Sequence, residues 1–218
     1  SLITEKIIGK FKERVIYIGH VGSYARGEAT NSSDIDINVI LDKVDFKDID
    51  EYKSIVISMP FHEKACGFLA DRAELMRWPR HELFHFLYGS RTLYGQVLDF
   101  IAEPTKDEIK FYLKISVSGI LHFARHTYIY SHDLANDILM MKDCFKSSFF
   151  ILQAYIKLHE DKIILKKSEV IKHELDDLSK AVLIISQEWP HLEEDLRKRP
   201  EYYFKILIDW SSFMMKSI

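Results

Sequence analysis

The distribution of apolar residues along the chain changes near residue 104. Before it, short apolar runs alternate with polar turns, whereas after it apolar positions recur every three or four residues over long stretches, as in amphipathic helices. Pro104 restricts the residue before it, and Thr105 can cap a new helix. We therefore expect two domains, residues 1–104 and residues 105–218, with residues 102–105 between them.

The first domain is expected to combine helices and strands. Residues 2–13 space their apolar side chains as a helix does, and residues 34–41 alternate apolar and polar positions with the period of two that is typical of a strand. Residues 80–88 follow a proline and predict a second helix. Short apolar runs predict further strands at residues 15–18, 54–59, 65–70 and 92–94.

The second domain is expected to be helical throughout. Its periodicity predicts four long helices at residues 106–130, 133–159, 168–188 and 200–215. Asp133 and Ser168 are residues that suit helix starts. Because an antiparallel bundle is the economical packing for such helices, the predicted fold class is α+β, a mixed sheet with flanking helices followed by a C-terminal antiparallel helical bundle.

Composition narrows the class of protein. The chain has 218 residues, of which 47% are hydrophobic and 29% charged, and its formal net charge is -3. These values exclude wholesale disorder and do not favour a nucleic-acid-binding surface. No apolar run approaches the ~18 to 20 residues of a membrane span. Two cysteines cannot form a disulfide framework, and residues 1–10 are charged, unlike a secretory signal, so we expect a cytoplasmic protein with neither membrane nor nucleic acid as partner.

One stretch of the first domain carries recognisable chemistry. Gly22 follows a strand, where the missing side chain lets a ligand approach the backbone, and a short helix opening at Ser23 would offer free N–H groups to a phosphate. Asp34 and Asp36, two residues apart on a strand, leave the same face and repel each other unless a cation lies beside them. Mg²⁺ binds carboxylate and phosphate oxygens together, so this arrangement predicts metal-assisted transfer of a nucleotide.

This stretch resembles the signature of the nucleotidyltransferase superfamily related to DNA polymerase β. That signature is a hydrophobic residue, Gly-Ser, about ten residues, and Asp-hydrophobic-Asp-hydrophobic. Here it reads Val21-Gly22-Ser23 and Asp34-Ile35-Asp36-Ile37. The details Ala25-Arg26-Gly27 and Ser33-Asp34 resemble the small bacterial branch, which includes minimal nucleotidyltransferases and antibiotic adenylyltransferases. The resemblance implies a nucleotidyltransferase core in residues 1–104.

The resemblance also implies roles for individual residues. Gly22 and Ser23 would hold the phosphates of ATP or another nucleoside triphosphate, with Arg26 and Ser33 beside them. Asp34 and Asp36 would be the catalytic, metal-binding residues and would hold two Mg²⁺ ions. A nucleotidyl group, in most of the family adenylyl, would move to a hydroxyl of a small molecule or protein, and pyrophosphate would leave. The acceptor, the base and the oligomeric state, a homodimer included, stay open.

One feature of the family is not evident. A third carboxylate usually stands on a later strand, but Cys66 occupies about that position, with Glu63, Asp71 and Glu74 flanking the strand. Loss of this acid would weaken proton abstraction, which general-base catalysis accelerates by about 10² to 10⁴-fold. The alternative hypothesis is therefore a regulatory or antitoxin module that binds nucleotide or a partner protein with little turnover.

Two histidine-containing motifs have an ordinary interpretation beside a functional one. His81-Glu82-Leu83-Phe84-His85 has the spacing of a zinc protease helix, for which Glu103 would be a third ligand. The interpretation that we favour is an amphipathic helix packed on the sheet. Arg125 and His132 are seven residues apart, as in the R-x(4–6)-H ribonuclease motif of helical HEPN domains. An ordinary surface pair is favoured because the residues around His132 indicate a helix break.

Two charged features also allow two interpretations. The acidic run of residues 42–51 would attract a cationic acceptor, although its lysines favour a solvated loop. Arg26 would either contact phosphate or form an ion pair with Glu28.

Overall fold

The computed structural model describes residues 1–31, 33–80 and 82–218, and the chain divides into two compact units, Ser1–Pro104 and Thr105–Ile218. The elements of the first, here called the N-terminal unit, are α1 (Leu2–Phe11), β1 (Val15–His20), α2 (Gly22–Arg26), β2 (Ile35–Leu41), α3 (Phe46–Ile57), β3 (Ala65–Asp71), α4 (Arg72–Arg77), α5 (Leu83–Tyr88) and β4 (Arg91–Tyr94), with short 3₁₀ turns at Lys12–Arg14, His62–Lys64 and Val97–Asp99.

Within the described residues, four strands form one mixed sheet in the order β3-β2-β1-β4. β1 is antiparallel to both β2 and β4, whereas β2 and β3 are parallel and are connected through α3. The strands expected at residues 15–18, 34–41, 65–70 and 92–94 are present, so the predicted mixed sheet with flanking helices is confirmed.

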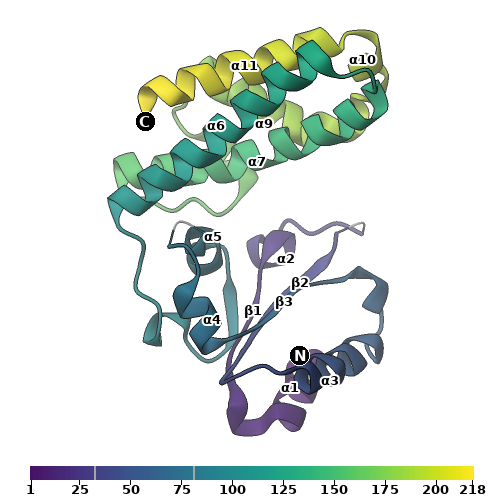
Figure 1. Cartoon of the computed structure of the whole chain (residues 1–218), viewed down its shortest axis with the longest axis vertical. Coiled ribbons are helices and arrows are strands. Elements are labelled where there is room, and N and C mark those ends of the chain that lie inside the picture. The colour runs from purple at the N-terminus through teal and green to yellow at the C-terminus, as the bar shows by residue number, and fades with distance from the viewer. Residues whose placement is uncertain (32, 81) are drawn as a thin grey trace. The chain divides into compact units, whose positions relative to one another are not determined.

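Helices cover both faces of this sheet (Figure 1), and each face carries its own hydrophobic cluster. α1 and α3 cover one face, where Ile7, Phe11, Ile18 and Val39 are buried. The helices α4 and α5 cover the other face, on residues that include Tyr17, Ile40, Leu75 and Leu83. Since side chains alternate along a strand, Asp36 leaves β2 on the same face as Ile40, toward the α4 and α5 side.

The prediction of a strand at residues 54–59 is wrong, because α3 continues to Ile57. The start of this helix decides the outcome. Asp45 and Asp48 form a capping box, in which each side chain accepts a hydrogen bond from the other residue's backbone N–H. Ile55, whose β-branched side chain favours a strand in isolation, instead packs from α3 into the cluster shared with α1.

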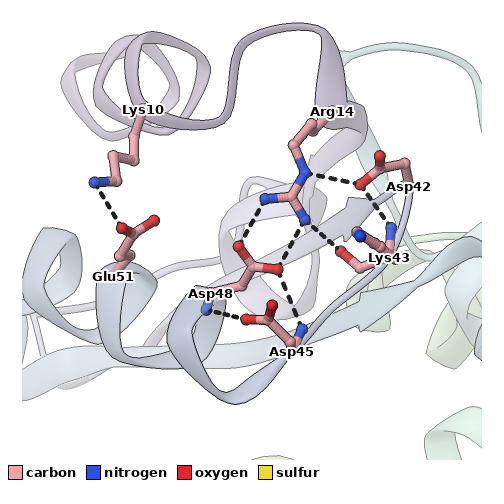
Figure 2. Close-up of polar contacts among 7 residues, drawn as sticks. All are labelled: Lys10, Arg14, Asp42, Lys43, Asp45, Asp48 and Glu51. Carbon is pink, nitrogen blue, oxygen red and sulfur yellow. Dashed lines mark hydrogen bonds and ion pairs between the residues drawn. The ribbon is translucent and has the colours of Figure 1, made fainter.

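The acidic run of residues 42–51 is not a loop throughout, because residues 42–45 lead into α3 at Phe46, and one of its carboxylates, that of Asp48, is buried and paired (Figure 2). The Arg14 guanidinium donates two hydrogen bonds of 2.7 Å to the buried Asp48 carboxylate. It also donates to the Asp42 carboxylate at 3.0 Å and to the Lys43 carbonyl at 2.9 Å. The hydrogen bonds from Arg14 hold the pKa of Asp48 at about 2.

The second unit, here called the helical unit, consists of α6 (Lys106–Tyr130), α7 (Leu134–Glu160), α8 (Lys167–Lys172), α9 (Asp177–Glu188), α10 (Glu193–Lys198) and α11 (Pro200–Ser217), with a 3₁₀ turn at Trp189–His191. Four of these helices, α6, α7, α9 and α11, pack into a bundle (Figure 1). Its core includes Phe145, Phe149 and Trp210, whose indole N–H donates to the buried Ser179 hydroxyl at 3.1 Å. No helix in the described part of the chain has both the length and the apolar run that crossing a bilayer requires.

The helix starts predicted from capping residues are confirmed at two positions. Thr105 forms a capping box with Glu108 at the start of α6, and Asp133 accepts the Asn136 N–H at the start of α7. The single helix expected at residues 168–188 is instead two helices. Residues 173–176 interrupt it, and Asp176 caps the second by accepting the Ser179 N–H at 3.0 Å.

Candidate active site

The turn between β1 and β2 begins with a glycine that the geometry requires. Gly22 has a φ of 67°, a conformation that residues with a Cβ rarely adopt. A Cβ on Gly22 would lie 2.2 Å from Oδ2 of Asp36, so the Asp36 carboxylate is packed directly against this glycine. The Val21 N–H donates to the Asp36 carbonyl at 3.0 Å and fastens the turn to β2. The start of α2 and one predicted metal ligand are thus neighbours.

The end of α2 is equally well defined. Gly27 has a φ of 70°, and its N–H donates to the Tyr24 carbonyl while the Glu28 N–H donates to the Ser23 carbonyl, the pattern of a Schellman motif. At the start of α2, no side chain of a described residue caps the free N–H groups. Gly22 and Ser23 therefore present backbone donors beside Asp36, as an anion site requires.

The remaining predicted residues have individual environments. Asp34 is exposed and directly precedes β2, whereas Asp36 is half-buried inside it. Ser33 closes the turn ahead of them, since its hydroxyl accepts the Thr30 N–H at 2.9 Å. Arg26 forms an ion pair with Glu28 at 3.1 Å, which is the second of its two expected roles.

The sequence that forms this turn and sheet was compared with known protein families. Residues 4–77 match the family model of the nucleotidyltransferase domain. The range contains β1, α2, β2 and β3, so the resemblance inferred from the Gly-Ser and Asp-Ile-Asp motif is confirmed. No curated protein sequence matches the chain significantly.

The fold of the whole chain is also similar to a solved structure. A crystal structure of spectinomycin adenyltransferase from Enterococcus faecialis, with ATP and spectinomycin, superposes with a TM-score of 0.51 at 15% sequence identity. The alignment covers 94% of this chain and 96% of that one. The similarity therefore extends from the nucleotidyltransferase domain through the helical unit and confirms the predicted fold class.

The strand beside Asp36 shows what stands at the position of the expected third acid. β2 and β3 are parallel, and Cys66 is the register partner of Asp36. Asp71 pairs with Leu41, five residues further along, and at about 3.3 Å per residue it lies roughly 16 Å away. Asp71 and Glu74 are moreover engaged in the capping box of α4. Neither is therefore placed where the third acid is expected.

Glu63 is the remaining candidate of the three. It lies in the 3₁₀ turn that leads into β3, with a side chain that is 60% exposed, and its Oε2 is 4.0 Å from Nδ1 of His62. The same turn is fastened near the site, because the Lys64 ammonium donates to the Asn31 carbonyl at 2.5 Å. Among the described residues there is no group of three or more histidine, cysteine, aspartate and glutamate side chains that could hold a metal ion.

The donors that are present nevertheless fit Mg²⁺. Asp34 and Asp36 supply hard carboxylate oxygens, and the missing side chain of Gly22 keeps the space beside Asp36 Oδ2 free of carbon. This donor set suits a hard cation that the two carboxylates share with a phosphate. It does not suit a cation whose ligands all come from the protein.

Sequence reasoning overlooked His20, the last residue of β1. Its register partners are Ile37 on β2 and Arg91 on β4, and its ring stands edge-on to Tyr24 of α2 at 6.4 Å. Burial, and then the positive charge of Arg91, lower the pKa of His20, so its imidazole is neutral at neutral pH. A polar residue that ends an apolar strand just before the Gly-Ser turn was the available indication.

The two histidine motifs do not gain support. His81 lies outside the described residues. Glu103, the expected third zinc ligand, accepts a hydrogen bond from the Tyr88 hydroxyl at 2.8 Å. Arg125 lies within α6 and donates to the Ser212 hydroxyl, whereas His132 lies in the segment between α6 and α7. The predicted helix break at His132 is confirmed, and it removes the shared helix face that the ribonuclease motif needs.

Proposed function

We propose that the N-terminal unit binds a nucleoside triphosphate with Mg²⁺ and transfers its nucleotidyl group, adenylyl from ATP, to a hydroxyl of a small molecule or protein. The observation that carries this proposal is the packing of the Asp36 carboxylate against Gly22. The match of residues 4–77 to the nucleotidyltransferase domain supports it.

Each motif residue has a task in this reaction. The backbone N–H groups at the start of α2 donate to the phosphates, and Gly22 lets those phosphates approach the chain. Asp34 and Asp36 hold the Mg²⁺, which when bound neutralises phosphate charge and orients the leaving group. The Ser33 turn and the Arg26–Glu28 ion pair hold the loop that carries these residues.

The bonds of the reaction balance without a further reagent. The acceptor oxygen forms a bond to the α-phosphorus, the bond from that phosphorus to the bridging oxygen of the β-phosphate breaks, and pyrophosphate leaves. The acceptor proton passes to a carboxylate or to water. Because the solved relative contains ATP and spectinomycin, hydroxyl-rich antibiotics belong among the acceptors to be tested.

The test is incubation of the full chain with labelled ATP, Mg²⁺ and a panel of acceptors that includes the protein itself, with pyrophosphate release as readout. We expect release from the parent and a loss of at least about 100-fold in Asp36→Asn, since the amide cannot replace the carboxylate toward a cation. Asp50→Asn, an exposed change of the same kind on α3, is the matched control. Equal release from parent and Asp36→Asn would contradict the proposal.

The position of Cys66 favours a second candidate, a module that binds nucleotide or a partner protein with little turnover. Cys66 is the register partner of Asp36, at the position where a carboxylate would accept the proton of the acceptor. Tight ATP binding without pyrophosphate release from any acceptor would favour this module over the transferase.

A further inference from the structure

The helical unit carries a pair of histidines that the proposed function does not use. His122 and His126 lie four residues apart on α6, and both side chains are exposed. Their ring centroids are 5.8 Å apart, and the ring planes are inclined by 35°. Residues four apart on a helix are neighbours on one face, so the two imidazoles stand side by side.

Side-by-side imidazoles on a helix form a two-point ligand for borderline metal ions. This is the spacing by which paired histidines bind Zn²⁺ in helical metal sites. Neutral imidazole nitrogen suits Zn²⁺, Ni²⁺ and Cu²⁺ and is a poor ligand for Mg²⁺. We propose that His122 and His126 form a binding site for a divalent late transition metal, with Cu²⁺ bound more tightly than Ni²⁺ or Zn²⁺.

The surroundings of the pair are compatible with a bound cation. Arg125, the adjacent positive residue, donates to the Ser212 hydroxyl of α11 at 3.3 Å. On the other side, the Tyr130 ring lies 5.1 Å from the His126 ring and completes a ladder of three rings along α6. Because the described residues contain no group of three metal ligands, the remaining coordination positions of the ion are left to water or a small ligand.

The site is tested on the full chain without a histidine tag, by titrating CuCl₂, NiCl₂ or ZnCl₂ and measuring bound metal by equilibrium dialysis. One equivalent of Cu²⁺ is expected per chain. Loss of an outer-shell partner alone typically costs about 10- to 100-fold in metal affinity, so removal of one imidazole in His122→Gln or His126→Gln is expected to weaken Cu²⁺ binding by at least about tenfold.

Two matched variants separate this site from others. His85→Gln removes a member of the chain's other histidine pair with this spacing, and His132→Gln removes a nearby exposed histidine. Both are expected to bind Cu²⁺ as the parent does. Undiminished binding in His122→Gln and His126→Gln, loss of binding in His85→Gln, or no binding by the parent would each overturn the proposal. Because the readout is bound metal, the result is independent of nucleotidyl transfer.

Discussion

Two glycines with a left-handed backbone conformation lie at the two ends of the short helix α2. They differ in the atoms that an added Cβ would contact. A Cβ on Gly22 would lie 2.2 Å from Asp36 Oδ2, whereas a Cβ on Gly27 would meet no atom within 4 Å. Their φ angles, 67° and 70°, are nearly equal. The pair therefore separates the cost of backbone strain from the cost of displacing the Asp36 carboxylate.

Gly22→Ala is expected to weaken binding of ATP with Mg²⁺ by at least about tenfold, because its Cβ would displace the Asp36 carboxylate from the place where it would hold the cation. Gly27→Ala has the same backbone strain, about 1 to 2 kcal/mol, without that displacement, and should retain ATP affinity. Isothermal titration of both variants measures the difference. Equal affinities would show that Gly22 acts only through the backbone.

Introducing a carboxylate at Cys66 is expected to increase turnover. Cys66→Glu places a carboxylate opposite Asp36 and should raise pyrophosphate release by up to about 10² to 10⁴-fold, the range of general-base catalysis. Cys66→Gln has nearly the same shape without the base and should leave the rate unchanged. If both variants release pyrophosphate at the parent rate, the missing acid does not limit this site.

At the scale of elements, charged residues from three segments stabilise the start of α3. Figure 2 shows the Arg14 guanidinium, at the end of the turn after α1, lying over the Asp48 carboxylate of α3 and reaching Asp42 beside β2. The Lys10–Glu51 ion pair connects α1 to the next turn of α3 at 2.9 Å, but it is more exposed. The buried contact and the exposed contact should therefore differ in their effect on stability.

Asp48→Asn is expected to lower the free energy of unfolding by on the order of 2 kcal/mol, since the pKa of Asp48 is held at about 2 against an ordinary 3.8. Glu51→Gln should cost less than about 1 kcal/mol. Urea unfolding at neutral pH measures both. A larger loss of unfolding free energy in Glu51→Gln than in Asp48→Asn would show that the exposed ion pair, and not the buried one, stabilises α3 more.

The contact between Arg14 and Asp48 also makes the free energy of unfolding depend on pH in the acid range. The folded pKa of Asp48 is lowered, so its stabilisation is complete above pH 3.8 and is lost as the pH falls through about 2. The difference in unfolding free energy between the parent and Asp48→Asn is therefore expected to shrink over this window. A constant difference from pH 5 to pH 2 would show that the carboxylate charge is not what stabilises the start of α3.

At the scale of the whole molecule, the fold consists of a core similar to that of nucleotidyltransferases and a helical unit. The solved relative aligns over 94% of the chain even though only 15% of the residues are identical. Such a low identity conveys the fold alone, so the substrate has to be sought through binding to the intact protein.

ATP with Mg²⁺ is expected to stabilise the intact chain against unfolding by about 2.7 kcal/mol at a ligand concentration 100 times the Kd. Comparison of ATP with GTP, CTP and UTP in the same thermal unfolding assay gives the base preference. Asp36→Asn should lose most of the shift, while Asp50→Asn should keep it. The absence of a shift with every nucleotide would argue against a nucleotide site.

Local spacing was enough to predict several features of this protein. The period of two at residues 34–41, the Gly-Ser turn before it and the capping residues Thr105 and Asp133 each act over a few residues, so they can be interpreted without knowing the fold. That locality is why the mixed sheet, the helical second half and the nucleotidyltransferase resemblance could be predicted.

Only the tertiary structure decided what depends on partners distant in sequence. Residues 54–57 became helical because Ile55 packs into the cluster shared with α1, and because Arg14, 34 residues away in sequence, donates to Asp48 at the start of α3. The register of β2 against β3 set Cys66 opposite Asp36 and carried Asp71 to the far end of the strand. Strand register and helix packing are long-range choices, and no window of neighbouring residues contains the energies that settle them.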